Sequence, residues 1–398
     1  MGTKTSVWQV YVLALISFLV GTSEYIVSGI LDQIAESLGV TVVVAGQLIT
    51  VFSLSFAVGT PILMAATVRL DRRKLMLYAL GLFVLANLLS FVLPGFPLFV
   101  IARVLMALGA GVVVVVSLSI ASKIAPPGKE ASSIATVIMG FTAALIVGVP
   151  LGRMVASAFD WKAVFLGIAL AGLLGLLIIA LTVPKVEGDE PVPILQQFAL
   201  LKQPKIAIGL GITFFWICGY SIVYSYITPY LIEVSGFHPS MVSSALLAFG
   251  LASLVGSQLG GYTTDRWGAY ATLSRSIGLH MVFLLLLYFT AGSVVAVFVC
   301  LILWSFAAWT TGPAQQVNLV KLAPESSGVM LSLNQSAVHL AIAAGAGLGG
   351  LVVANVSLAA ITWFGAAGLG LSLLGVLLLS RMVSSASPAP RAGQGQRV

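Results

Sequence analysis

Long apolar runs, separated by short polar, Gly or Pro breaks, make up most of this chain. A helix that spans a bilayer needs about 20 mostly apolar residues, and twelve runs reach that length. They cover residues 7–31, 42–68, 74–93, 97–122, 131–157, 162–183, 206–232, 241–263, 271–291, 293–320, 326–354 and 356–381. The pattern therefore predicts an all-α integral membrane protein with twelve transmembrane helices.

The twelve apolar runs divide evenly around one polar segment. Residues 184–205 contain four prolines and the acidic stretch Glu187-Gly188-Asp189-Glu190, a composition typical of a linker. We expect an N-terminal six-helix half over residues 1–183, a linker over 184–205 and a C-terminal six-helix half over 206–383. The segment 384–398, rich in Ser, Ala, Pro, Gly and Gln, is expected to be disordered.

The composition supports the membrane assignment and the charge gives an orientation. Hydrophobic residues make up 59% of the chain and charged residues 8%, against about 25% charged residues in soluble proteins. The 19 Lys and Arg exceed the 12 Asp and Glu, for a net charge of +7. Nearly all of these basic residues fall on one predicted side of the membrane, and only Arg153 and Lys162 fall in segments on the other. Because cytoplasmic loops retain Lys and Arg, we expect both termini in the cytoplasm and no nucleic-acid partner.

A local pattern recurs in the two halves. After the eighth run the chain reads Gly261-Tyr262-Thr263-Thr264-Asp265-Arg266-Trp267-Gly268, and after the second run it reads Met64-Ala65-Ala66-Thr67-Val68-Arg69-Leu70-Asp71-Arg72-Arg73-Lys74. Both segments are basic turns between the second and third helix of a half. Two six-helix halves with parallel repeats are the layout of a rocking secondary transporter with a site near the bilayer midplane.

Three motifs resemble those of the major facilitator superfamily, and the resemblance covers essentially the whole chain. The first is the loop motif formed by Gly261, Asp265, Arg266 and Gly268; its copy in the first half is degenerate, with Val68 where Asp is expected. The second, Gly140 with Gly148, Pro150 and Gly152, is similar to the antiporter motif of exporters, although Val149 splits the usual Gly-Pro pair. The third, Arg103 followed by Gly109 and Gly111, resembles a motif whose Arg is implicated in proton coupling. Together they imply a twelve-helix drug:proton antiporter of the major facilitator fold.

Further segments are similar to bacterial purine base and nucleoside efflux pumps. They are Gly21-Thr22-Ser23-Glu24-Tyr25, Gly29-Ile30-Leu31, Ala45-Gly46-Gln47-Leu48-Ile49, Pro313-Ala314-Gln315-Gln316 and Ala323-Pro324-Glu325-Ser326-Ser327. Arabinose-efflux-permease-like proteins and chloramphenicol exporters share several of these features. The resemblance implies export of small organic molecules, best purine bases or nucleosides, across the bacterial cytoplasmic membrane, with multidrug or chloramphenicol export and then sugar efflux as alternatives.

Glu24 is the only acidic residue well inside a predicted helix. A charge in hydrocarbon costs at least a few kcal/mol, so an ionisable residue there indicates function. Arg103 lies at nearly the same depth, ~10 Å from the outer helix ends at 1.5 Å per residue, so the two side chains are expected to meet. We interpret Glu24 as the residue that binds the exchanged proton and Arg103 as the residue that modulates the pKa of Glu24. The alternative is a permanent buried ion pair that only fixes helix packing.

Polar and aromatic side chains inside the other spans are candidate substrate contacts. Trp216, Tyr220 and Tyr224 recur at a spacing of four and form one helix face, as do Gln335 and His339. Aromatic faces stack on flat heterocycles, although such a stripe is more often packing, and His339 is as readily structural as substrate-contacting. The full set of candidates is Gln47, Trp216, Tyr220, Tyr224, Trp304, Gln335, His339 and Asn334, the last only if its helix is rotated suitably.

A second set of residues is a candidate for conformational change. Pro150 removes a backbone donor and predicts a bend that helps seal one conformation, while Gly148 and Gly152 allow close helix approach, with plain packing as the default interpretation. Asp265 and Arg266, in the turn from Gly261 to Gly268, are expected to lock the inner face, or are merely solvated.

The pattern favours a transporter over two other classes. A membrane enzyme would need a catalytic pair or metal ligands, and the three His residues are far apart with no HExxH motif. A receptor or scaffold would leave Glu24 without a purpose. We predict no metal and no cofactor, a proton gradient as the energy source because a lone carboxylate is a poor sodium site, and a monomer whose partners are a small-molecule substrate, protons and the lipid bilayer.

Overall fold

Helices of the length that a bilayer requires dominate the structure. The computed structural model describes residues 7–67, 69–92, 94–125, 130–187, 200–324 and 327–384. Within these ranges, 12 helices are long and apolar enough to cross a membrane. The predicted all-α, twelve-helix fold class is therefore confirmed. Val68, much of the predicted linker and the predicted disordered tail beyond residue 384 lie outside the described residues.

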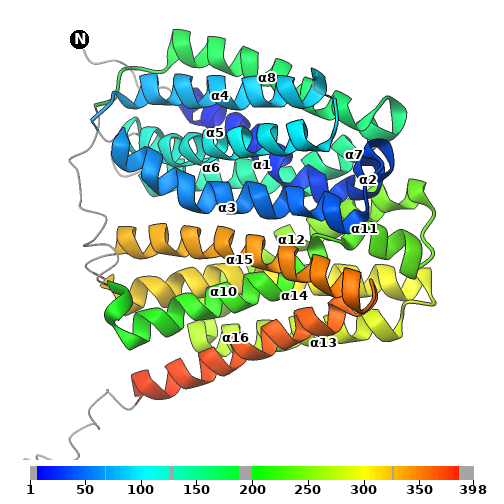
Figure 1. The fold of residues 1–398 in the computed structure, drawn as a ribbon. Coiled ribbons are helices and arrows are strands. Elements are labelled where there is room, and N and C mark those ends of the chain that lie inside the picture. Colours follow the sequence, from blue (N-terminus) through cyan, green and yellow to red (C-terminus); the bar gives the residue numbers. More distant parts are fainter. Residues whose placement is uncertain are drawn as a thin grey trace, which may run out of the picture.

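The first half of the chain, which we call the N-half, forms one group of antiparallel helices (Figure 1). Its elements are α1 (Val7–Gly29), α2 (Leu31–Leu38), α3 (Val42–Ala66), α4 (Arg72–Val92), α5 (Phe96–Lys123), α6 (Glu130–Ala143), the π-helical η1 (Ala144–Gly148), α7 (Val149–Ala158) and α8 (Trp161–Thr182). Side-chain caps begin several of them: Thr41 accepts from the Val44 amide at 3.2 Å, and Asp160 accepts from the Lys162 amide at 2.8 Å.

The second half, the C-half, forms a matching group below it in Figure 1. Its elements are the short 3₁₀ helix η2 (Leu200–Lys202), α10 (Pro204–Tyr224), α11 (Ile227–Pro229), the π-helical η3 (Tyr230–Val234), α12 (Pro239–Trp267), α13 (Ala269–Phe289), α14 (Val294–Leu322), α15 (Ser327–Asn355) and α16 (Ile361–Ser384).

Two predicted spans are less regular than the apolar pattern indicated. The run at 131–157 contains the π-helical turn η1 directly before Pro150, and the run at 206–232 breaks after Tyr224 into α11 and η3. Proline lacks the backbone donor that a continuous helix uses, and Pro150 and Pro229 stand at these two points. The apolar pattern cannot detect such breaks because the residues on either side remain hydrophobic.

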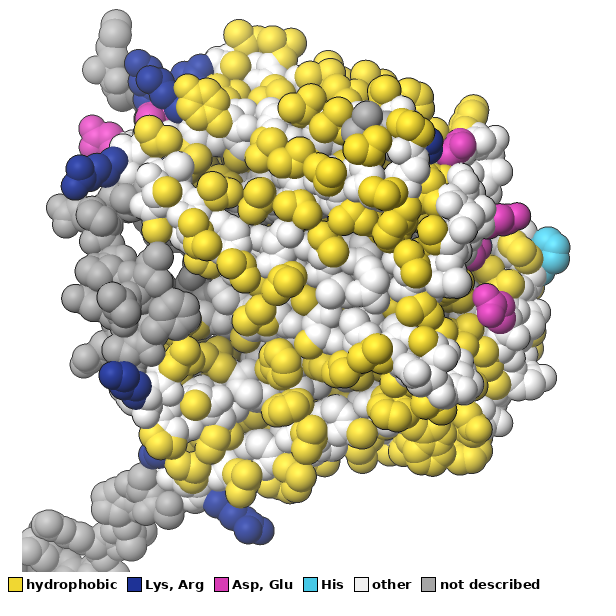
Figure 2. Space-filling model, viewed as in Figure 1, with side chains coloured by type: hydrophobic (Ala, Val, Ile, Leu, Met, Phe, Trp, Pro, Cys, Tyr) yellow, Lys and Arg dark blue, Asp and Glu magenta, His cyan; other side chains and the backbone are white. Residues whose placement is uncertain are grey.

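The two ends of the molecule differ in their connections. At one end, which we call the linker end, α8 ends, α10 begins and α16 ends; α2 and α11 lie at the opposite end, the distal end (Figure 1). The visible Lys and Arg side chains gather mostly at the linker end, and a band of hydrophobic side chains covers the surface between the two ends (Figure 2). The linker end corresponds to the side on which the sequence places the basic loops.

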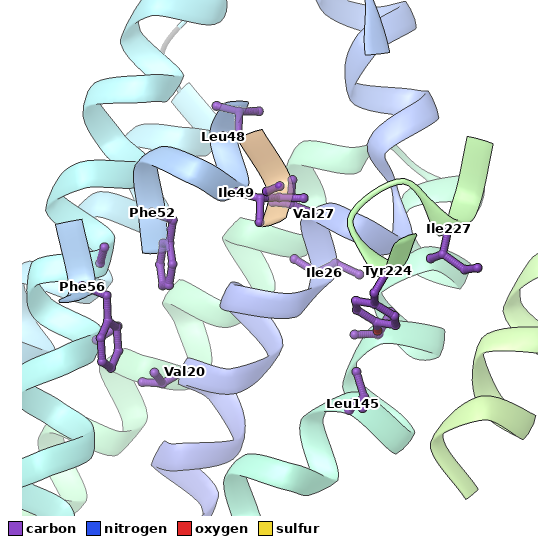
Figure 3. Close-up of a cluster of buried hydrophobic side chains, with 14 of the residues drawn as sticks. Val20, Ile26, Val27, Leu48, Ile49, Phe52, Phe56, Leu145, Tyr224 and Ile227 are labelled. Carbon is purple, nitrogen blue, oxygen red and sulfur yellow. The ribbon is translucent and has the colours of Figure 1, made fainter. Parts of the chain in front are cut away.

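The halves meet along a few defined helix pairs. α3 packs against α15, α12 packs against η1 and α7, and α11 packs against α1 and α2. At the distal end the Thr228 hydroxyl donates to the Ser28 carbonyl at 2.7 Å in a buried position. Tyr226 is fully buried, and a side chain at Gly46 would overlap its hydroxyl. The distal ends of the halves are thus packed together, and Figure 3 shows the buried apolar cluster, to which both halves contribute.

Candidate functional site

Glu24 lies on α1 in the middle of the protein. Its side chain is 5% exposed, and neither carboxylate oxygen accepts a hydrogen bond from any residue that the structure describes. An ionised carboxylate without hydrogen bonds is costly in such surroundings, and binding a proton removes that cost. The environment of Glu24 therefore suits a group that gains and loses a proton.

The nearest polar partner of Glu24 comes from the other half. His339 on α15 places its Nδ1 atom 3.7 Å from Glu24 Oε1. The imidazole stacks on Phe56 of α3, with ring centroids 3.7 Å apart and an interplanar angle of 20°. A side chain of the C-half thus contacts two residues of the N-half, which the sequence pattern did not predict.

Arg103 and Glu24, whose side chains we expected to meet, form no ion pair among the described residues, so the alternative of a permanent ion pair is not seen in this conformation. Its Nη1 atom donates to the Ser23 carbonyl at 2.8 Å, and its guanidinium lies over the Phe52 ring, 4.1 Å from the centroid. The depth estimate was sound, since Arg103 is fully buried and close enough to interact electrostatically with Glu24. The direction of the side chain decided the contact, because Arg103 binds the backbone one residue before Glu24. Depth along a helix does not determine that direction.

The aromatic stripe on α10 belongs to a larger cluster inside the C-half. Tyr220 and Tyr224 stack with centroids 5.1 Å apart, and Tyr220 also contacts Trp304 at 5.7 Å and His280 at 6.2 Å. Phe249 of α12 packs against Trp304 at 5.0 Å. Tyr220 is half-buried whereas the other members of the cluster are buried, so Tyr220 is the member that solvent or a ligand can reach.

Trp304 was expected among the substrate contacts, but it lies on the buried side of the aromatic cluster, packed against Tyr220 and Phe249. It is fully buried, and its Nε1 atom donates to His280 Nε2 at 2.6 Å. Because the indole has one polar group and that group is already bonded, Trp304 has neither an exposed face nor a free donor for a ligand in this conformation.

The remaining predicted contacts lie in three different places. Gln335 is exposed and places its Nε2 atom 3.2 Å from His339 Nε2, so these two form one group as predicted. Trp216 is half-buried, with an indole nitrogen that has no hydrogen-bond partner among the described residues. Gln47 donates to the Val43 carbonyl of its own helix at 3.4 Å, and its amide lies beside Gly350 of α15, which at 1.5 Å per residue is ~16 Å along the helix from His339. Gln47 therefore lies apart from Glu24 and His339.

Asn334 belongs to a structural network and not to the site. Its Oδ1 atom accepts from the Thr213 hydroxyl at 2.7 Å, and Gln315 donates to Thr213 at 2.8 Å and to the Gly209 carbonyl at 2.7 Å. One residue along a helix rotates a side chain by about 100°, so Asn334 points away from the direction of Gln335.

The predicted conformational residues divide into packing positions and a turn. Gly148 and Gly152 lie where a side chain would overlap Thr22 and Ile26 of α1, which favours the packing interpretation. Pro150 follows the π-helical turn η1, where the α-helical hydrogen-bond pattern is interrupted, and the bend that seals one conformation stays a prediction. Gly268 follows the last residue of α12 and has a φ of 82°, a conformation that favours glycine, whereas a side chain added at Gly261 would meet no described atom within 4 Å.

Among the described residues, Asp265 and Arg266 form no lock with a neighbouring helix in this conformation. Both side chains are exposed, and Arg266 donates to the Tyr262 hydroxyl of its own helix at 2.9 Å. The degenerate copy in the N-half makes the stronger contacts. Asp71 accepts from the Val186 amide at 3.1 Å, and the Arg72 amide donates to the Val186 carbonyl at 2.7 Å.

Sequence reasoning also missed an ion pair at the distal end. Arg153 is 2% exposed and binds Asp32 through two parallel hydrogen bonds of 2.9 and 3.0 Å. The same guanidinium donates to the Gly29 carbonyl, where α1 ends and α2 begins. Arg153 is one of the two basic residues on the predicted outer side, and that rarity was the available signal.

The described residues contain no group of three or more His, Cys, Asp or Glu side chains that could hold a metal ion. Cys218 and Cys300 are free and buried. The candidate chemistry at the centre of the molecule therefore consists of one carboxylate, one imidazole, one guanidinium and several phenols and indoles.

Two packed six-helix halves with a buried carboxylate at their contact are the layout expected of a secondary transporter. The sequence pattern of the Major Facilitator Superfamily matches residues 13–346 and 210–397. The chain belongs to this family, whose members are secondary transporters and not enzymes.

Two relatives from Bacillus subtilis strain 168 cover nearly the whole chain. One, named "Uncharacterized MFS-type transporter YbcL", is 59% identical over 375 residues, which are 94% of this chain and 96% of that protein. The other, "Uncharacterized MFS-type transporter YtbD", is 29% identical over 95% of this chain and 96% of that protein.

Solved structures agree with the fold. A bacterial homolog of the human lysosomal transporter Spinster, in an inward-facing and unoccupied conformation, has a TM-score of 0.77 at 18% identity and covers 98% of this chain and 100% of its own. A D-xylose-proton symporter has a TM-score of 0.76 at 17% identity and covers 93% of this chain and 96% of its own. At these identities the likeness extends to the fold alone.

Proposed function

We propose that this secondary transporter is a proton-coupled exporter of small planar organic molecules, best purine bases and nucleosides, in the bacterial cytoplasmic membrane. Glu24 carries the exchanged proton, and Arg103 influences it through its buried charge. The termini and the linker end face the cytoplasm. Export then exchanges a substrate molecule moving outward for protons moving inward.

One observation carries the proton coupling. Glu24 is a buried carboxylate between the two halves, and neither of its oxygens has a hydrogen-bond partner among the described residues. A purely structural carboxylate would be expected to have its oxygens satisfied, because buried polar groups are almost always bonded. An unsatisfied carboxylate is instead suited to alternate between charged and neutral forms as the transporter changes conformation.

The walls near Glu24 support a neutral, flat substrate. Tyr220 and Tyr224 offer stacked phenol rings, and Tyr25, next to Glu24, packs edge-on against Phe141 at 5.6 Å. Stacking on aromatic side chains is worth about 1–3 kcal/mol per base. The exposed amide of Gln335 can pair with the polar edge of a heterocycle. Chloramphenicol or another drug, and behind them a sugar, are the competing substrates.

The test is gradient-driven transport into inside-out membrane vesicles with an acidic lumen. Radiolabelled hypoxanthine, adenine and chloramphenicol are each offered to vesicles that contain the wild type or the Glu24→Gln variant. We expect the wild type to concentrate a purine several-fold in the lumen, and we expect Glu24→Gln to lose this accumulation while still exchanging labelled for unlabelled purine. Glu36→Gln, which alters an exposed carboxylate on α2, is the matched control and should accumulate as the wild type does.

Two results would count against the proposal. Gradient-driven accumulation by Glu24→Gln at the wild-type level would remove the proton role of Glu24. Accumulation of chloramphenicol without any purine would move the substrate class to drugs while leaving the coupling intact.

A further inference from the structure

The contact between Glu24 and His339 joins the two halves at the level of the proposed proton site. Glu24 belongs to α1 of the N-half and His339 to α15 of the C-half, and both side chains are at most 5% exposed. Glu24 Oε1 and His339 Nδ1 are 3.7 Å apart, and neither atom has a hydrogen-bond partner among the described residues. Two unsatisfied buried groups therefore face each other across the interface.

The other ring nitrogen of His339 determines which proton the imidazole carries. The Gln335 amide nitrogen lies 3.2 Å from His339 Nε2. With the Gln335 amide oriented so that its nitrogen faces Nε2, the amide donates and Nε2 accepts, and the neutral imidazole in this arrangement carries its proton on Nδ1. The Nδ1–H bond is consequently available to the carboxylate of Glu24.

The stacking of His339 on Phe56 fixes the plane of the ring. The centroids are 3.7 Å apart with an interplanar angle of 20°, so tilting the imidazole out of its present plane would disrupt this stacking. A shortening of roughly 1 Å brings the pair to the ~2.8 Å of a charge-assisted N–H···O bond. The present geometry is thus close to a bonded arrangement, which a small displacement of α15 relative to α1 completes.

We propose that His339 is a positioning residue for the proton on Glu24: its Nδ1–H donates to the ionised carboxylate and latches the two halves together until Glu24 binds a proton. This inference rests on the proposed role of Glu24 as the proton carrier. When a proton from solution binds the carboxylate, Glu24 becomes neutral and the bond loses its charge assistance, so the halves can separate at this contact. The imidazole keeps its own proton throughout.

Other charged or titratable groups near the pair are accounted for. Arg103 on α5 interacts electrostatically with Glu24 from within the same half. Tyr25 on α1 interacts with Glu24, and Tyr220 and Tyr224 on α10 interact with Tyr25. The neighbours that α3 and α15 contribute directly, Phe56 and Gln335, do not titrate. Arg103 belongs to the N-half and moves with Glu24, whereas His339 belongs to the C-half and moves with it.

Two substitutions of similar size separate the latch from simple packing. His339→Asn keeps an amide donor near the position of Nδ1, whereas His339→Gln places its amide near the position of Nε2 and leaves Glu24 without a donor. Both variants lose the stacking on Phe56. The pH profile of gradient-driven purine transport is measured in proteoliposomes for each variant, with Glu24→Gln and the exposed His238→Asn as reference variants.

We expect His339→Gln to move the midpoint of the pH profile about one to two units to the alkaline side. The sign follows because the donor stabilises the ionised carboxylate, so its loss makes Glu24 hold its proton to higher pH; a charge-assisted bond of about 1.5–3 kcal/mol corresponds to a shift of that order. His339→Asn, which keeps a donor near the position of Nδ1, and His238→Asn, at an exposed position, should keep the wild-type midpoint.

Equal midpoints for the wild type and His339→Gln would overturn the latch, and so would equal shifts for His339→Asn and His339→Gln. If one of the two variants does not fold, the other is compared with the wild type alone. The midpoint of the pH profile should then shift for His339→Gln and stay unchanged for His339→Asn. Failure of the proton role of Glu24 is distinguishable, because it appears as gradient-driven transport by Glu24→Gln whatever the His339 variants do.

Discussion

The two halves of this transporter share a fold but bury different chemistry. The N-half buries charge: Glu24, Arg103, Arg72 and Arg153 are each at most 6% exposed. The C-half buries neutral groups, with the Trp304–His280 hydrogen bond inside an aromatic cluster and the Asn334 network of amides and hydroxyls. Among the described residues, the buried Asp, Glu, Lys and Arg side chains therefore lie in the N-half.

The inner turns of the two halves repeat this contrast. In the N-half, Asp71 and Arg72 bind the chain at Val186 as it leaves α8, and the Lys123 ammonium donates to the Glu187 carbonyl at 2.9 Å. In the C-half, Asp265 and Arg266 remain exposed although their motif is the better preserved of the two. The linker directly follows the N-half and not the C-half. Its first residues, at Val186, therefore bind the turn at Asp71 and Arg72, whereas among the described residues no such segment lies beside the turn at Asp265 and Arg266.

Removing the buried charge at the distal end should have the largest effect on stability. Arg153→Met leaves Asp32, whose side chain is 24% exposed, without its bidentate partner. Breaking such a pair costs about 3 kcal/mol, so the melting temperature of the detergent-solubilised protein should fall by several degrees. Arg381→Met, at an exposed position on α16, is the control and should leave it unchanged. An unchanged melting temperature for Arg153→Met would mean that charge does not organise the N-half.

The neutral network of the C-half should show a smaller loss. Trp304→Phe removes the donor to His280 and part of the volume that packs against Tyr220 and Phe249. A buried acceptor left unsatisfied costs about 1–3 kcal/mol, so a fall in melting temperature smaller than that of Arg153→Met is expected. Trp363→Phe, at a residue that is 45% exposed, is the matched control. A larger loss for Trp304→Phe than for Arg153→Met would reverse the ranking of the two halves.

The inner turns should give the smallest effect and the most direct comparison. Asp71→Ala removes the acceptor for the Val186 amide, and one hydrogen bond contributes about 1 kcal/mol. We expect the Val186 amide to exchange its hydrogen roughly fivefold faster, measured by hydrogen–deuterium exchange and mass spectrometry. Asp265→Ala makes the equivalent change in the C-half and should alter no exchange rate near Val186. Similar acceleration in both variants would show that the two turns are equivalent.

Much of the fold could be predicted because a bilayer imposes one length and one polarity on every span. The apolar runs therefore gave the number of helices, and the depth of Glu24 and Arg103 followed from position along the run. The helix breaks at η1 and η3 and the distal ion pair between Asp32 and Arg153 could not be predicted in this way, because neither changes the hydrophobic pattern.

The candidate site was predictable in its residue types but not in its pairs. Glu24, His339 and Gln335 stood out as polar residues inside spans, and Gln335 and His339 share a face because they are four residues apart. Trp304 and Asn334 stood out for the same reason, yet the first lies behind the aromatic cluster and the second in a packing network. Helical periodicity determines which residues share a face, whereas it leaves open which way that face points.

The sequence by itself determined that the chain is a twelve-helix membrane protein of two halves, with one carboxylate deep inside a span. Those properties depend on local composition and on the energy of placing polar groups in hydrocarbon. Only the tertiary structure decided that Glu24 faces His339 while Arg103 binds the backbone at Ser23. The physical reason is that contacts between halves depend on how each helix is rotated about its axis, and that rotation is set by packing among all of its neighbours.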